Sequence, residues 1–228
     1  GSMVLGFMGG SYQPMGAREP VWRNAREGLA HVWGNRPVRS LLLLSLLMEA
    51  FAFSHHVMLP VMARDVLEVG GTGYGLLASA SGIGAFVSTA VVAYMGDFRS
   101  KAKLLMTAGG GFGLFLLLFA LSPLLPFSYA VALVVLVLVG AMSMAYDTTM
   151  GALLQLLVPD AMRGRVMGLY VLTFGFTPLG GFLAGAIASL LGAPVAIGLG
   201  GGIVMAYVLG HVRSMSRIRE GETAAEPG

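Results

Sequence analysis

Six long apolar stretches, separated by short polar segments, constrain this chain more than any other feature. Each stretch is close to the ~20 residues that a helix needs to cross the hydrocarbon of a bilayer. The predicted spans are residues 40–63, 74–95, 104–122, 127–147, 166–191 and 194–212. A β-barrel would need short segments of alternating hydrophobicity, and these runs do not alternate. The sequence therefore predicts an all-α membrane protein with six transmembrane helices.

The positive charges give these spans an orientation. Thirteen of the fourteen Lys and Arg residues fall on one side of the membrane, and only Arg64 falls on the other. The thirteen are Arg18, Arg23, Arg26, Arg36, Arg39, Arg99, Lys101, Lys103, Arg163, Arg165, Arg213, Arg217 and Arg219. Because cytoplasmic loops carry the Lys/Arg excess, we expect both termini to be cytoplasmic.

Composition excludes several classes of function. Charged residues make up 11% of the chain, against about 25% in ordinary soluble domains. The net charge of +3 is therefore assigned to anionic lipid headgroups and not to nucleic acid. With no cysteine there is no disulfide, thiolate metal site or thiol nucleophile. No catalytic motif, phosphate-binding loop or ATPase module is found, so we expect no enzyme activity and no cofactor, and any pumping would use an ion gradient.

The segments outside the spans differ in character. Residues 1–20 are interpreted as a tag scar followed by a mobile Gly/Pro-rich segment, since Gly1-Ser2 precedes Met3. Residues 21–38 are predicted to be an amphipathic helix in the interface, ended by Pro37, because apolar residues recur every three or four positions. Residues 39–212 form the six-helix domain, and residues 213–228 are expected to be a polar cytoplasmic tail.

Among the ionisable residues inside the predicted spans, four are candidates for function. Glu49 lies ten residues into the first span, and His56 follows two turns later on the same face, with His55 about 100° away. Asp147 lies late in the fourth span. An acid at the bilayer centre costs roughly 2.5–3.5 kcal/mol unless it faces protein or water. Glu49 therefore either exchanges a proton during transport or only holds helices together.

Other features of the spans have competing interpretations. Asp147 either lines a cavity or marks a helix end. His55 and His56 with Met58 and Met62 could indicate a metal site, but adjacent histidines diverge on a helix and Met is common in apolar spans, so no metal is predicted. The glycines within the spans favour close helix packing, as in Gly181-x-x-x-Gly185, although bending in a transporter is the alternative. Pro60 and Pro178 are candidate bends.

Three stretches resemble a known family. Residues 93–101, with Asp97, Arg99 and Lys101, resemble the acidic–basic signature that major facilitator transporters carry between their second and third helices and repeat in their second half. Ala93 and Ser100 stand where the family usually has Gly. Residues 155–168 resemble the loop before the eleventh helix in the branch that exports drugs and siderophores. The matching residues are Pro159-Asp160, Arg163-Gly164-Arg165 and Gly168.

The third stretch, residues 175–185, resembles the eleventh helix of that enterobactin-exporter-like branch. It contains Pro178 followed by Gly180, Gly181 and Gly185, and it lacks the Gly that precedes Pro in the antiporter signature. The similarity covers residues 25–212. It implies the C-terminal half of a major facilitator, a 3+3 inverted repeat of six helices, in which Asp97, Arg99, Lys101, Arg163, Arg165, Pro178, Gly180 and Gly181 serve gating.

The resemblance implies a function as well as a fold. A half-size transporter has half a cavity, because the two halves of such proteins bind substrate between them. We expect a parallel homodimer, or pairing with a separately encoded first half, in a bacterial inner membrane. Glu49, His56, Asp147 and His55 would line the cavity and couple protons to export of a small amphipathic or siderophore-like molecule. The alternatives are a non-transporting membrane scaffold and a fragment of a full-length transporter.

Overall fold

The computed structural model describes residues 21–95 and 100–225. Every element within these ranges is helical, and six helices are long and apolar enough to cross a membrane. The spans are Arg36–Val66, Gly70–Tyr94, Lys101–Leu124, Ser128–Leu157, Asp160–Leu191 and Ala193–His211. The predicted fold class, six membrane-spanning helices with no strand in the described residues, is therefore confirmed.

Several spans are divided into shorter elements. The first comprises α2 (Arg36–Leu47), the π-helical turn η2 (Met48–Ala52), α3 (His55–Val61) and a second π-helical turn, η3 (Met62–Val66). The next three are α4 (Gly70–Met95), α5 (Lys101–Leu121) with the 3₁₀ turn η4 (Ser122–Leu124), and α6 (Ser128–Leu157). The fifth comprises α7 (Asp160–Thr173), the 3₁₀ turn η5 (Phe174–Phe176) and α8 (Thr177–Leu191), and the sixth is α9 (Ala193–Ala225).

The interfacial helix α1 (Val21–Gly34) ends earlier than its predicted boundary. Pro37 does not end it. Asn35 caps the next helix by accepting a hydrogen bond from the Val38 backbone N–H at 3.4 Å, and Pro37 stands in the first turn of α2. Proline is tolerated there because the first backbone N–H groups of a helix have no partner within the helix. Pro37 therefore starts the first span.

Two other boundaries differ from the prediction. Helix α6 continues ten residues beyond Asp147, to Leu157, so this acid does not mark a helix end. Helix α9 continues to Ala225, past the expected boundary at residue 212. In both cases the polar residues at the predicted boundary remain helical, because a helix satisfies its own backbone groups whatever its side chains. The expected mobile segment 1–20 lies outside the described residues.

Glycine sets the distance between the packed helices. A Cβ at Gly84 of α4 would overlap the Val137 carbonyl of α6, and a Cβ at Gly140 would overlap the Ser81 carbonyl in return. Helices α5 and α9 repeat this arrangement, since a Cβ at Gly113 would lie 2.7 Å from the Gly201 oxygen. Small residues are what permit such backbone contact in a membrane, where van der Waals packing replaces the hydrophobic effect between helices.

The expected Gly181-x-x-x-Gly185 contact is only half present. A Cβ at Gly185 would meet no atom within 4 Å, whereas one at Gly181 would lie 2.9 Å from the Val57 side chain. The closest approach in this region belongs to Gly180, where a Cβ would overlap the Ala50 carbonyl of η2. Gly180 therefore permits the contact between the first and fifth spans.

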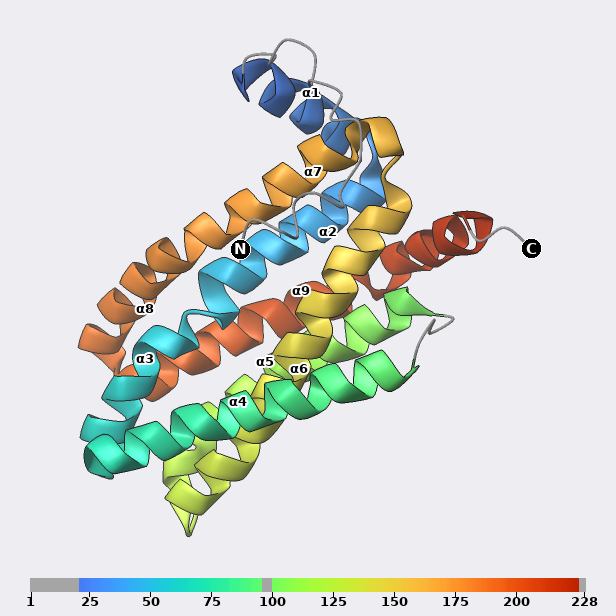
Figure 1. Ribbon diagram of the computed structural model, residues 1–228. Helices are drawn as coiled ribbons and strands as arrows, with labels where there is room; N and C mark the ends of the chain where they lie inside the picture. The colour runs from blue at the N-terminus through green and yellow to red at the C-terminus, as the bar shows by residue number, and fades with distance from the viewer. Residues whose placement is uncertain (1–20, 96–99, 226–228) are drawn as a thin grey trace, which may run out of the picture.

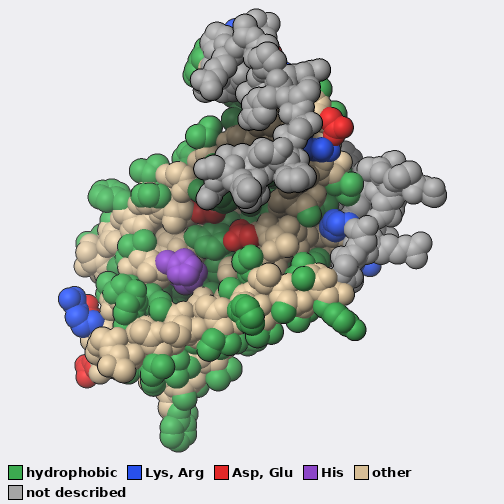
Figure 2. Space-filling model, viewed as in Figure 1, with side chains coloured by type: hydrophobic (Ala, Val, Ile, Leu, Met, Phe, Trp, Pro, Cys, Tyr) green, Lys and Arg blue, Asp and Glu red, His purple; other side chains and the backbone are tan. Residues whose placement is uncertain are grey.

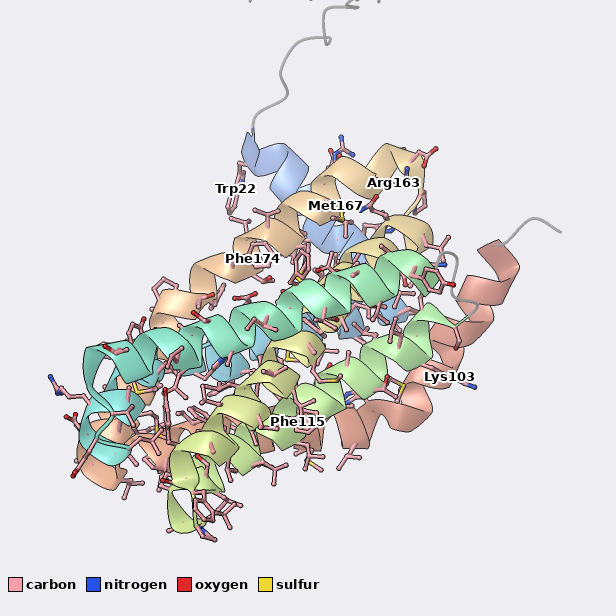
Figure 3. All side chains as sticks on the ribbon, turned by 60° about the horizontal axis from the view of Figure 1, so that its bottom comes forward. Trp22, Lys103, Phe115, Arg163, Met167 and Phe174 are labelled. Atoms are coloured by element: carbon pink, nitrogen blue, oxygen red, sulfur yellow. The ribbon has the colours of Figure 1, made fainter. Side chains whose placement is uncertain are left out.

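The helices form two groups around a broad face. In Figure 1, the α7–α8 span and α4 lie at opposite edges of the view, with α2, α3 and α6 between them. Helices α5 and α9 pack against each other and support this face from behind. Figure 3 shows Lys103 and Arg163 toward one end of the bundle, the end from which the first, third and fifth spans start. We call this the basic end.

We predict that Gly84→Ala destabilises the six-helix unit. The added methyl group overlaps backbone that cannot move without separating α4 from α6, and overpacking of this kind costs about 1–3 kcal/mol. Denaturant titration in detergent micelles, followed by circular dichroism, measures the loss. Gly82→Ala is the matched control, because a Cβ there meets no atom within 4 Å. Equal stability of the two variants would contradict the packing described above.

Candidate functional site

Glu49 lies in the π-helical turn η2, at the centre of the first span. Its side chain is buried, with 7% of its surface exposed, and it forms a hydrogen bond with the Thr177 hydroxyl of α8. A π turn adds one residue to the helix and frequently marks a functional site. The turn brings Glu49 toward the fifth span at the point where that span is also interrupted, between η5 and α8.

A second hydrogen bond joins the same two spans one helical turn away. The buried hydroxyls of Ser45 and Thr173 are 2.8 Å apart. Each pair is separated by 128 residues, so Ser45 and Glu49 meet Thr173 and Thr177 in the same register. The first and fifth spans therefore run parallel at this point. Two side-chain hydrogen bonds connect them in an otherwise apolar layer, Ser45–Thr173 and Glu49–Thr177, and we call these the two polar rungs.

The fourth span contributes a second acid to this layer. Asp147 of α6 is half-buried and lies near enough to Glu49 for their charges to interact. Two buried tyrosines, Tyr146 of α6 and Tyr170 of α7, are also within electrostatic range of both acids. Four ionisable side chains from three spans are therefore gathered at one level. The sequence analysis identified the two acids but neither tyrosine.

A cavity of about 440 Å³ opens on the broad face beside this layer. Asp147 and both histidines contribute to its wall, and Asp147 makes no hydrogen bond or ion pair with any residue that the structure describes. The other lining residues are Phe53, Leu59, Tyr74, Ala78, Ser81, Gly82, Ala85, Leu136 and Ser143. Figure 2 shows acidic side chains and a histidine gathered in the hollowed middle of this face.

The position of Glu49 differs from our expectation. We expected this side chain to line the cavity between two halves, but its own six-helix unit buries it and supplies a hydrogen-bonding partner, Thr177. Asp147 is the acid that lines the cavity. The difference arises because the π turn changes the direction of Glu49 relative to a regular helix, and no residue pattern in the sequence indicates that turn.

Both histidines line the cavity, but their exposure differs. His55 is 2% exposed and its Nδ1 lies 2.6 Å from the Ala52 carbonyl, whereas His56 is exposed at the cavity wall. A carbonyl can only accept, so His55 Nδ1 carries the proton and donates. Residues Phe53 and Ser54 interrupt the helix between Glu49 and the histidines, which removes the regular phase on which our prediction depended. No three metal-ligating side chains converge within the described ranges.

The motif arginines contact different elements at the basic end. Arg163 forms an ion pair with Asp160 at 2.6 Å and donates to the Gln155 carbonyl at 3.2 Å, which holds the turn between α6 and α7. Arg165 forms an ion pair with Glu27 of α1 at 2.8 Å. Gly28 packs directly on Arg165 and Leu169. Arg165 thus connects the interfacial helix to the fifth span.

The remaining predicted residues have separate positions. Lys101 begins α5, while Asp97 and Arg99 lie outside the described residues, so their contacts stay a prediction. Pro178 stands in the first turn of α8, directly after η5, and accounts for the interruption of the fifth span there. Sequence reasoning missed Thr177 and Glu27. A hydroxyl residue immediately before a proline in an apolar span was the available signal for Thr177.

A larger hollow, of about 750 Å³, lies elsewhere and carries none of this chemistry. It lies between α5 and α9, and its wall consists of aliphatic side chains, prolines and glycines, among them Leu121, Pro194 and Gly198. An apolar groove on the outside of a bundle is filled by lipid chains in a membrane. We therefore assign the functional site to the smaller, polar cavity.

We predict that the polar cavity contains water in a membrane. The chain has no cysteine, so single cysteines can be introduced without a background. Ser143→Cys places a thiol in the cavity wall, and water-soluble methanethiosulfonate reagents should label it because their target, the thiolate, forms only in water. Leu138→Cys, on the exposed apolar side of the same helix, is the control and should stay unlabelled. Equal labelling would show that the cavity is no wetter than the lipid-facing surface.

Comparison with known proteins identifies the family. The family model described as transmembrane secretion effector, a branch of the major facilitator type, matches residues 13–227. Searches of curated proteins and of solved structures returned no match. The matched region includes all six spans, both polar rungs and the cavity. This chain belongs to the transmembrane secretion effector family of major-facilitator membrane transporters.

Proposed function

We propose that this protein exports a small amphipathic or siderophore-like molecule in exchange for protons, as a parallel homodimer in a bacterial inner membrane. The observation that carries the proposal is the buried pair of acids, in which Glu49 is hydrogen-bonded inside the bundle and Asp147 is open to the cavity. The family and the six spans support the class, a membrane transporter.

Two acids that interact at low dielectric can couple a proton to a ligand. Ionisation of one carboxyl group opposes ionisation of the other, and burial opposes both. A ligand that donates hydrogen bonds or positive charge to the acids favours their ionised forms, so its binding opposes proton binding by the pair. Proton and ligand therefore weaken each other's binding, as an exchanger requires.

The cavity wall fits an amphipathic ligand. Phe53 and Tyr74 offer aromatic faces, and Ser81, Ser143 and Asp147 offer polar groups. Lys and Arg are absent from the described residues of the wall, which favours a ligand that is neutral or cationic at the contact with this half. The volume of about 440 Å³ is within the range of small-molecule sites.

We predict that Glu49→Gln abolishes proton coupling. Glutamine has the same shape and can still bond to Thr177, but it cannot bind and release a proton. The measurement uses proteoliposomes with an imposed pH gradient and a pH-sensitive dye inside, with ethidium as the amphipathic cation and 2,3-dihydroxybenzamide as the catechol probe. The rate of probe-dependent proton movement in the parent should be at least tenfold that in the variant.

The control for this experiment is Glu68→Gln, which makes the same change at an exposed carboxylate between the first two spans. It should transport like the parent. Transport by Glu49→Gln at the parental rate under the same gradient would contradict a coupling role for Glu49.

The broad face supports the proposed homodimer. It is hollowed and carries acidic side chains, and Phe86 of α4, next to the cavity residue Ala85, is 77% exposed. An even number of spans lets two copies insert in one orientation and meet about a two-fold axis along the membrane normal. Each copy would then close the other's cavity.

We predict a mass of two chains per particle in lipid nanodiscs. Mass photometry or light scattering at nanomolar to micromolar protein concentration makes the measurement. Phe86→Ala should raise the fraction of one-chain particles, because it removes the packing of a large side chain from the proposed contact. A parental particle that contains one chain at every concentration would contradict the homodimer.

A membrane scaffold is the second candidate function. The observation that favours it is α1, where Trp22, Leu29 and Trp33 are exposed by 80%, 50% and 65% while the opposite side contacts α7. Such a helix suits attachment to a lipid surface or a partner. A protein that binds neither probe and moves no protons would favour the scaffold over the exporter.

A further inference from the structure

The Thr177 hydroxyl stands between two oxygen atoms. One is the Glu49 carboxyl oxygen Oε2, and the other is the Phe174 carbonyl oxygen, 3.0 Å away. A hydroxyl has one proton to donate and two lone pairs to accept with. A carbonyl can only accept. Thr177 therefore cannot donate a full hydrogen bond to both neighbours, and the protonation state of Glu49 decides which one receives the proton.

The neighbouring rung shows one of the two arrangements in a form that cannot titrate. Thr173 donates to the Tyr170 carbonyl at 2.6 Å, which uses its only proton, so Ser45 must donate to Thr173. Ser45 of the first span thus donates to Thr173 of the fifth span, and Thr173 donates to the Tyr170 carbonyl, three residues earlier. Thr177 and Phe174 repeat the same spacing, with Glu49 in the place of Ser45.

Protonated Glu49 can act as Ser45 does. Its O–H donates to Thr177, and the Thr177 hydroxyl donates to the Phe174 carbonyl. Ionised Glu49 has no proton to donate, so the Thr177 hydroxyl rotates and donates to the carboxylate. The Phe174 carbonyl then loses the hydrogen bond from the Thr177 hydroxyl and retains the one from the Thr177 backbone N–H. Phe174 begins η5, the turn that divides the fifth span.

We propose that Thr177 is a positioning residue that transmits the protonation state of Glu49 to the break between α7 and α8. A proton on Glu49 adds a hydrogen bond within η5 and holds the break closed, and loss of that proton transfers the bond to the carboxylate. The inference rests on the proposed function in one respect, which is that the proton bound by Glu49 is the transported proton. It assigns the route by which that event changes a second span.

The surroundings of Glu49 leave this route open. The ionisable groups that face it are Asp147 and Tyr146 of α6 and Tyr170 of α7. None of the three is recorded in a hydrogen bond with the Glu49 carboxyl, whereas Thr177 is. On the α8 side, Gly180 holds the two backbones in contact at Ala50, so a change at η5 cannot be absorbed by separation of the spans.

The first measurement is an infrared titration of the protein in lipid nanodiscs without ligand. The C=O band of a protonated carboxyl that disappears in Glu49→Gln reports Glu49. Thr177→Val removes the donor to the carboxylate, so the titration midpoint should rise by about one pH unit, given the strength of hydrogen bonds to charged groups. Thr177→Ser retains the hydroxyl and should titrate like the parent.

The second measurement is hydrogen–deuterium exchange of the backbone across residues 174–181, above and below that midpoint, corrected for the intrinsic effect of pH. The parent and Thr177→Ser should be more protected at the lower pH, whereas Thr177→Val and Glu49→Gln should show no difference. Thr173→Val is the matched control for folding. It removes the other rung and should leave both the midpoint and the pH effect in place.

Three results would overturn the proposal. They are a parental band that does not titrate, a Thr177→Val midpoint equal to the parent's, and a pH effect on exchange that survives Thr177→Val. Neither measurement uses a substrate or a gradient. Failure of transport in proteoliposomes would therefore refute the proposed function without bearing on this route, and the reverse also holds.

Discussion

A bilayer cannot solvate polar groups, and this constraint organises the whole molecule. Each backbone amide is satisfied inside a helix, so every described element is helical. Helices in lipid gain their contacts by close packing, so glycine occupies the crossings between α4 and α6 and between α5 and α9. The same constraint gathers the polar side chains of three spans into one layer, where Glu49 bonds to Thr177 and Ser45 bonds to Thr173.

The interruptions of the first and fifth spans coincide with that layer. The π turn η2 and the 3₁₀ turn η5 face each other, with Glu49 on one and Thr177 directly after the other. Pro178 has no N–H to donate to the Phe174 carbonyl four residues earlier, so at this interruption a side chain can change the bonding of the backbone. Proton binding at Glu49 can thus affect a backbone joint as well as a cavity. The ion pair between Arg165 and Glu27 connects the fifth span to α1 at the basic end.

The sequence carried enough information for the class, the spans and the acids, because hydrophobic length and rare charges are read directly from residue types. The sequence did not show that the first span is interrupted, so it did not show which face of the span each residue occupies. A regular helix placed His56 on the face of Glu49, but the interruption at Phe53 and Ser54 exposes His56 and buries His55. Nor could the sequence show that Thr177 bonds to Glu49, since contacts between residues 128 apart depend on how two distant spans pack.

The central claim is that the hollowed polar face is covered by protein and not by lipid. Nitroxide labels test it in the native membrane, on Phe86→Cys beside the cavity residue Ala85 and on Leu118→Cys of α5, both introduced into a chain without cysteine. Oxygen dissolves in the hydrocarbon and relaxes labels that lipid surrounds. Our account predicts much slower oxygen relaxation at residue 86 than at residue 118, and equal rates would contradict it.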